Sequence, residues 1–162
     1  MFKFEKFVGE EDFKLLKILV SNEAVMKMNM GRIFTEEEAR GFFQMILSCN
    51  KSAGVIGFYK IYLIETNEFI GLGAINENNE YEAKEIEYML LPQYWHKGYG
   101  TQVVNLLIGK IEKFFGTTSI VAITDPQNIY SRKILQNNSF VSKKIYVNED
   151  GESAELFMKG SL

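Results

Sequence analysis

The chain of 162 residues contains one cysteine, one histidine and two prolines. Cys49 has no second cysteine for an internal disulfide, and one cysteine with one histidine cannot form a Cys/His zinc cluster, so we predict no metal site. No apolar run approaches the ~20 residues of a membrane span, and the first twelve residues, MFKFEKFVGEED, lack the apolar core of a signal peptide. We therefore expect a cytoplasmic protein without a membrane partner.

An excess of positive charge is also missing. The net charge is −3, and the longest basic runs are the pairs Arg132-Lys133 and Lys143-Lys144. A surface that follows a nucleic-acid backbone needs many basic residues on one face, so we predict no nucleic-acid partner, although a local anion site stays possible. Hydrophobic residues make up 46% and charged residues 24%, as in ordinary globular proteins. With no repeat or linker-like segment, we expect a single domain over residues 1–162.

The first half of the chain alternates between helical and strand patterns. Aromatic and charged residues alternate over residues 2–7, which predicts a half-buried strand, and residues 10–20 have apolar side chains at helical spacing. Thr35 with Glu38 is a capping-box sequence and predicts a second helix directly after it. Three strand-like runs with short polar connections then predict an antiparallel meander over residues 54–65, 68–76 and 82–91.

The second half continues with a long amphipathic helix from Tyr99 to Phe114 and a short apolar strand at residues 119–124. This strand–helix–strand unit predicts parallel neighbours. A further helix is expected at residues 128–138, and a closing hairpin around Asn148 to Gly151. The predicted fold class is α+β, with a mixed, mostly antiparallel sheet of about seven strands flanked by four helices.

The stretch LLPQYWHKGYGTQ, which begins at Leu90, places two glycines between a strand end and a helix start. Backbone N–H groups in such a turn, with the positive end of the helix dipole behind them, form a concave anion site, and glycine lets an anion approach closely. The pattern is typical of a pyrophosphate site, although a plain strand-to-helix turn has the same spacing. Neither a Walker loop nor a dinucleotide fingerprint matches, since the residue three after Gly100 is Val103.

The same stretch, extended to EIEYMLLPQYWHKGYGTQ, resembles the central motif of the GNAT superfamily of acetyl-CoA dependent N-acetyltransferases. That motif is Arg/Gln-x-x-Gly-x-Gly/Ala after a strand ending in an apolar-x-Pro, and Gly98-Tyr99-Gly100 and Leu90-Leu91-Pro92 match it. The segment VMKMNMGRIFTEEEARGFF and the pair Asn128 and Ser131 resemble the subgroup of ribosomal-protein N-terminal acetyltransferases. Trp95, His96 and Ser139 depart from the family pattern.

The resemblance implies acetyl-CoA as cosubstrate, a splay at the central parallel strand pair, and a role for each part of the site. Ser131 would assist the leaving thiolate, and the amide of Leu90 would donate to the oxyanion. The implied acetyl-CoA contacts are the backbone of Met89, Leu90 and Leu91 for the pantetheine arm, that of His96, Lys97, Gly98, Tyr99, Gly100 and Thr101 for the pyrophosphate, and Asn128 and Ser131 near the sulfur.

A base is needed because a protonated primary amine cannot attack a thioester. Glu85 and Glu87 alternate on one predicted strand and so share a face. The resemblance favours Glu85, since the subgroup often carries Glu there, with Glu87 or water as alternatives. In many relatives a tyrosine on the fourth predicted helix serves as the general acid, but the matching position here is Leu135. Tyr130, next to Ser131 in the sequence, is an alternative for that role, and we prefer Ser131.

The expected function is therefore acetyl transfer from acetyl-CoA to a primary amine, by direct attack in a ternary complex. A protein N-terminal α-amine is one candidate acceptor, but no motif in the sequence selects the acceptor; Met26, Met28 and Met30 are expected to line its cleft. Alternatives are a small-molecule amine acetyltransferase acting on a polyamine, amino acid or antibiotic, and a non-catalytic acyl-CoA binding module. Both a monomer and a homodimer stay open.

Overall fold

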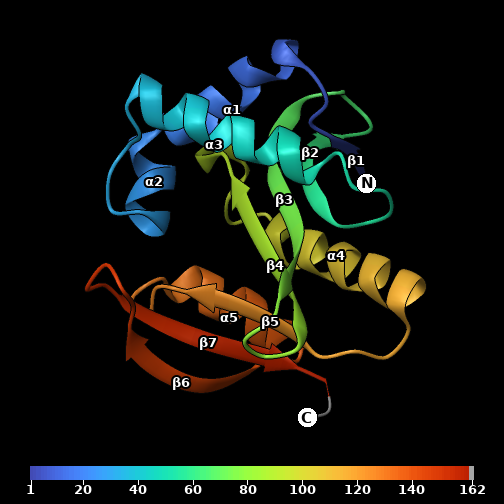
Figure 1. Cartoon of the computed structure of the whole chain (residues 1–162), viewed down its shortest axis with the longest axis vertical. Helices are drawn as coiled ribbons and strands as arrows, with labels where there is room; N and C mark the ends of the chain where they lie inside the picture. The colour runs from blue at the N-terminus through green and yellow to red at the C-terminus, as the bar shows by residue number, and fades with distance from the viewer. Residues whose placement is uncertain (161–162) are drawn as a thin grey trace.

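A computed structural model describes residues 1–160, which form one mixed seven-stranded sheet in the order β1-β2-β3-β4-β5-β7-β6 with helices on both faces (Figure 1). This confirms the predicted α+β class. The strands are β1 (Phe2–Lys6), β2 (Gly57–Leu63), β3 (Phe69–Asn78), β4 (Ala83–Leu90), β5 (Ile120–Thr124), β6 (Val141–Val147) and β7 (Ser153–Lys159). The α-helices are α1 (Phe13–Val20), α2 (Glu23–Asn29), α3 (Glu36–Cys49), α4 (Tyr99–Phe115) and α5 (Ile129–Asn137).

The described residues thus contain five α-helices, where the sequence predicted four. The additional helix is α2, which Asn22 caps by accepting a hydrogen bond from the N–H of Val25 at 3.1 Å. It has only seven residues, too few to display a helical period. The predicted capping box is confirmed: the Thr35 hydroxyl accepts from the Glu38 N–H at 3.1 Å, and the Glu38 carboxylate accepts from the Thr35 N–H at 3.0 Å.

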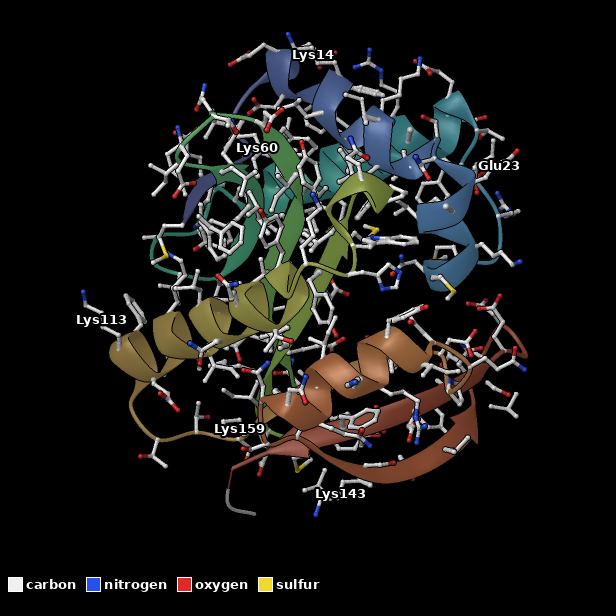
Figure 2. The ribbon with its side chains drawn as sticks, turned by 180° about the vertical axis from the view of Figure 1, so that it is seen from behind. Lys14, Glu23, Lys60, Lys113, Lys143 and Lys159 are labelled. Carbon is white, nitrogen blue, oxygen red and sulfur yellow. The ribbon has the colours of Figure 1, made fainter. Side chains whose placement is uncertain are left out.

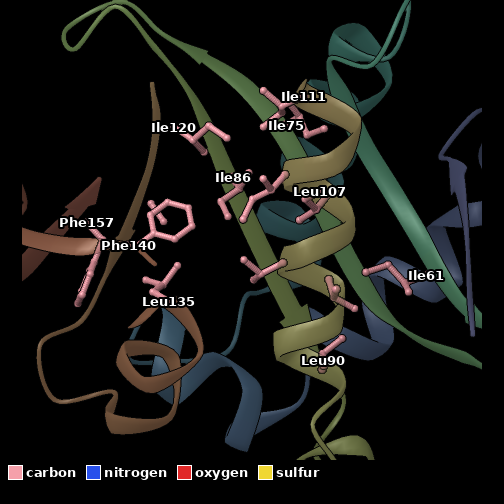
Figure 3. Close-up of a cluster of buried hydrophobic side chains, with 14 of the residues drawn as sticks. Ile61, Ile75, Ile86, Leu90, Leu107, Ile111, Ile120, Leu135, Phe140 and Phe157 are labelled. Carbon is pink, nitrogen blue, oxygen red and sulfur yellow. The ribbon is translucent and has the colours of Figure 1, made fainter. Parts of the chain in front are cut away.

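Two hydrophobic clusters sandwich the sheet. Helices α1, α2 and α3 cover one face, where the rings of Phe7, Phe13 and Phe43 pack together. Helices α4 and α5 cover the other face; Figure 3 shows Leu107 and Ile111 of α4 lying against the strands near Ile75 and Ile86. Because both faces are covered, the strands in the centre are apolar with little alternation.

The centre of the sheet is only partly paired. Strands β3 and β4 pair antiparallel along their length, whereas β4 and β5 pair in parallel over just two positions, Lys84 with Ile120 and Glu85 with Val121. Beyond these positions the two strands separate (Figure 1). The predicted parallel pair is therefore confirmed, and the C-terminal half of β4 has no strand on its β5 side.

A buried ion pair ties the start of α1 to β2. The Lys60 ammonium lies 2.9 Å from Oδ1 of Asp12, and the Val8 N–H donates to Oδ2 of Asp12 at 2.9 Å. The two side chains are 9% and 8% exposed. Burial opposes ionisation of Asp12, but the hydrogen bonds from Lys60 and Val8 outweigh it and hold the pKa of Asp12 below its ordinary value.

We expect Asp12→Asn to lower the free energy of unfolding by roughly 3–5 kcal/mol at pH 7, because Lys60 then stays buried without its counter-charge. Urea denaturation measures this. Lys3→Ala, at the exposed Lys3–Glu5 pair, is the control and should change stability far less. A carboxyl whose pKa is lowered in the folded protein contributes stability above its pKa in the unfolded chain and loses it as the pH falls. The difference in unfolding free energy between parent and Asp12→Asn should therefore decrease as the pH falls below about 3.8. A difference in unfolding free energy that does not change with pH would contradict this account.

Candidate functional site

A cavity of about 1160 Å³ opens where β4 and β5 separate. One wall is α2 with the following segment to Phe34 and part of α3; opposite it lie α5 and the turn between β6 and β7. In Figure 2, α2, which begins at the labelled Glu23, faces α5 and that turn across the opening. The floor is the end of β4 from Ile86 to Leu90, and the turn before α4 closes one end.

Most of the predicted acetyl-CoA contacts lie on this cavity. The predicted residues that line it are Met89, Leu90, His96, Gly98, Tyr99, Gly100, Thr101, Asn128 and Ser131. Leu91, Lys97 and Glu85 do not line it. Leu91 is buried in the cluster beneath α1 to α3, and its N–H donates to the Ile70 carbonyl at 2.8 Å. Lys97 is exposed.

Glycine is favoured at the two positions of the turn for different structural reasons. Gly98 has φ +77°, a left-handed conformation, and a Cβ there would meet no atom within 4 Å, so the backbone faces open space. No side chain caps the helix at this point. A Cβ on Gly100 would lie 2.5 Å from Cδ1 of Ile134, so this glycine lets α4 approach α5. The first turn of α4 therefore presents backbone N–H groups and a positive dipole to the cavity.

Trp95 and His96, which depart from the family pattern, have defined contacts. The indole N–H of Trp95 donates to the Leu90 carbonyl at 2.7 Å, and the Trp95 side chain packs against both hydrophobic clusters. His96 has φ +60°, and its ring meets the ring of Tyr130 edge-to-face at 4.5 Å. The two residues therefore hold the turn to β4 and to α5.

Of the two glutamates on β4, Glu87 is the one that lines the cavity. Its carboxylate accepts a hydrogen bond from the Asn76 amide at 3.2 Å, and that of Glu85 accepts one from Asn78 at 2.7 Å. The Glu87 side chain is exposed to the open space of the cavity, and protein atoms of the cavity walls surround it at longer range. This desolvation, with a smaller contribution from the charge of Glu85, raises the pKa of Glu87 to about 7 despite Asn76. Desolvation also raises the pKa of Glu85.

A pair of hydroxyl groups lies on the opposite side of β4. The phenol of Tyr88 and Oγ of Ser131 are 2.7 Å apart, and both residues line the cavity. Ser131 is fixed in the first turn of α5, where its N–H donates to Oδ1 of Asn128 at 3.0 Å. Burial raises the pKa of Tyr88 to about 12, so the phenol keeps its proton at neutral pH. Leu135, further along α5, is fully buried.

The sequence prediction missed Tyr88 because strand alternation put it on the face away from Glu87. The cavity wraps around the unpaired end of β4, so side chains from both faces reach it. The hydroxyl pair joins two residues 43 positions apart, and no local pattern signals it. Met26, Met28 and Met30 line the cavity, as the sequence predicted.

Within residues 1–160 no group of three His, Cys, Asp or Glu side chains could hold a metal ion. In the same part of the chain, no helix has both the length and the apolar character to cross a membrane. The arrangement offers instead a helix start without a side-chain cap, a carboxylate whose pKa is raised to about 7 and two hydroxyl groups along one cavity. These are the groups needed to hold a phosphorylated substrate and to move a proton between two reacting partners.

Residues 4–141 match the family model described as the acetyltransferase (GNAT) domain. An uncharacterized N-acetyltransferase p20 from Bacillus licheniformis is 28% identical over 153 residues, which cover 91% of this chain and 85% of that protein.

Two solved structures share the fold. One is a ribosomal L7/L12 α-N-protein acetyltransferase in complex with coenzyme A, with a TM-score of 0.78 and 19% identity over 98% of this chain and 93% of that one. The other is a spermidine N-acetyltransferase from Vibrio cholerae in complex with coenzyme A and spermine, with a TM-score of 0.79 and 13% identity over 98% of this chain and 95% of that one.

We expect Glu87→Gln to become progressively more stable than the parent as the pH rises. A carboxyl whose pKa is raised from 4.5 to about 7 in the folded protein destabilises it once the unfolded form ionises, and the neutral amide does not. The difference in thermal midpoint should grow in favour of Glu87→Gln between about pH 4.5 and 7 and stay constant above that window. A difference that is the same at pH 4.5 and pH 8 would contradict the raised pKa.

Proposed function

The chain belongs to the GNAT acetyltransferase family, whose members transfer the acetyl group of acetyl-CoA to amines, and from that premise we propose how its own cavity performs the transfer. One cavity connects the uncapped start of α4, the unpaired end of β4 and the carboxylate of Glu87, and the proposal rests on this connection. Acetyl-CoA enters as a substrate along the first two features. The amine approaches from the side of Glu87 and attacks the thioester directly in a ternary complex.

The pyrophosphate lies against the backbone from His96 to Thr101. Gly98 leaves open space there, and the helix dipole favours negative charge. The pantetheine arm lies beside the end of β4, in the gap that β5 leaves. Because the Leu91 N–H bonds to β3, alternation along an antiparallel strand turns the Leu90 N–H to the gap. An oxyanion needs a hydrogen-bond donor, and we assign the N–H of Leu90 to the thioester oxyanion.

Glu87 is the general base in this proposal, because it lines the cavity and Glu85 does not. A base with a pKa of about 7 is well matched to an α-amino group, which titrates near ~7.7–8.0, and poorly matched to a lysine amine near ~10.4. This match favours a peptide N-terminal α-amine as acceptor. Glu85 acts indirectly, by raising the pKa of Glu87 through its negative charge.

The departing sulfur is stabilised by the hydroxyl pair. After the amine nitrogen bonds to the acetyl carbon, the carbon–sulfur bond breaks and negative charge develops on sulfur. Ser131 donates its hydroxyl hydrogen to that thiolate, and because a hydroxyl has one hydrogen, the Ser131 oxygen then accepts from Tyr88. The start of α5 favours the same charge.

The test of the function is release of free coenzyme A when acetyl-CoA is mixed with a peptide that has a free N-terminus. Glu87→Gln should lower kcat/KM by roughly 10²- to 10⁴-fold at pH 7, since no carboxylate then removes the proton. Glu85→Gln should keep kcat/KM within a few-fold and move the acid limb of the pH profile to lower pH, because the repulsion that raises the pKa of Glu87 is lost.

A larger loss of kcat/KM in Glu85→Gln than in Glu87→Gln would identify Glu85 as the base, as the sequence resemblance favoured. Coenzyme A binding by the parent without transfer to any amine would instead identify a binding module.

Ser131→Ala should lower kcat by roughly 10- to 150-fold, because a hydrogen bond to a charged partner contributes ~1.5–3 kcal/mol in the transition state. Coenzyme A affinity should change much less, since the phosphates are held at α4. Tyr88→Phe should lower kcat less, and adding it to Ser131→Ala should cause little further loss, because Tyr88 acts through Ser131. Single-turnover rates at saturating acetyl-CoA measure both. Multiplicative losses in the double variant would show that Tyr88 acts independently of Ser131.

A further inference from the structure

One wall of the cavity takes no part in the chemistry proposed above. It consists of five apolar side chains from α2, α3 and the segment between them, here called the methionine wall: Met28, Met30, Phe34, Phe42 and Met45. Its two phenylalanines are held in place by ring contacts, Phe34 on Phe42 at 6.0 Å and Phe42 on Phe58 of β2 at 6.0 Å. The base of the wall is therefore anchored to the sheet.

The methionines of this wall are not needed to fill the core. Met30 is 48% exposed and Met45 is 42% exposed, and both line the cavity. Apolar surface that stays in contact with water inside a cavity gains free energy when an apolar ligand covers it. Methionine side chains are flexible and polarizable, and they adapt to ligands of different shape. The wall is therefore suited to an apolar group rather than to a polar one.

The charges on the methionine-wall side of the cavity do not suit a ligand with several positive charges. Three acidic residues line it: Glu87 on β4, Asp125 after β5, and Glu152 on the turn between β6 and β7. The Asp125 carboxylate already accepts the Gln127 N–H at 2.8 Å. No lining carboxylate comes from the elements that form the methionine wall, and Lys27 of α2 adds a positive charge there. A polyamine needs carboxylates spaced along its length, and this side of the cavity does not supply them.

We propose that the amine acceptor carries one positive charge and a large apolar group next to its nitrogen, as does a peptide that begins with Met, Leu or Phe. The amine meets Glu87, and the apolar group covers the methionine wall. This inference rests on the proposed function and adds the class of acceptor to it. A free arylalkylamine has the same chemistry as such a peptide, so the two sources are compared directly in the test.

The experiment measures kcat/KM from release of coenzyme A with four probes: the peptides Met-Ala-Gly-Ala and Ser-Ala-Gly-Ala, phenethylamine and spermidine. The Met peptide should exceed the Ser peptide and spermidine by roughly 10- to 100-fold, the discrimination typical of an apolar pocket. Whichever of the Met peptide and phenethylamine has the higher kcat/KM shows whether the acceptor is a peptide N-terminus or a free arylalkylamine. Equal rates for the Met and Ser peptides, or a preference for spermidine, overturn the inference and leave the proposed function intact. Failure to acetylate any probe while coenzyme A binds overturns the proposed function itself.

Variants of the wall connect the preference to these residues. Met30→Ser and Met45→Ser should each reduce the ratio of kcat/KM between the Met and Ser peptides, roughly tenfold when combined, with unchanged coenzyme A affinity as the check on folding. Ile33→Ser is the matched control, because Ile33 lies in the same segment, is 40% exposed and does not line the cavity. The control should keep the parent ratio. An unchanged ratio in the combined methionine variant overturns the assignment of the wall.

Discussion

The whole site depends on one interrupted pairing, the two-position contact between β4 and β5. A parallel pair that continued along β4 would place a strand where the cavity now lies. Because it stops after Glu85, both faces of the following residues become accessible, and Glu87 and Tyr88 reach the same cavity from opposite sides of one strand. The interruption also lets the starts of α4 and α5 face a common space. The end of this pairing therefore lets Glu87, the hydroxyl pair and the first turn of α4 line one cavity.

Much of this architecture could be predicted from local patterns in the sequence. The capping box at Thr35, the alternation in β1 and the strand–turn–helix around Gly98 are each specified by residues a few positions apart. Helix α2 could not be predicted in this way, because one turn of capping and two buried residues give no period. The preference for Glu87 over Glu85 depends on where the cavity reaches, and the contact of Tyr88 with Ser131 depends on packing between β4 and α5. Such long-range relations leave no local signal.

The two walls of the cavity present different chemical groups. The wall formed by β4 and the starts of α4 and α5 uses backbone groups, glycines and short polar side chains, which suit a substrate common to the whole family. The wall formed by α2, α3 and the segment between them uses exposed apolar side chains such as Met30 and Met45. Proteins of this fold that are named for a ribosomal protein and for spermidine show how widely acceptors vary on one framework. Acceptor choice can therefore change without disturbing the sheet.

The hydrogen bond from Trp95 to the Leu90 carbonyl has a consequence for solubility. An interrupted sheet contains a free hydrogen-bonding edge in its own interior, and free edges are templates on which other chains add strands and aggregate. The indole occupies the carbonyl at the open end of β4 and covers the apolar residues around it. A foreign strand would have to displace a partly buried aromatic ring to continue the ladder. Trp95 therefore opposes the addition of a foreign strand at this edge of β4.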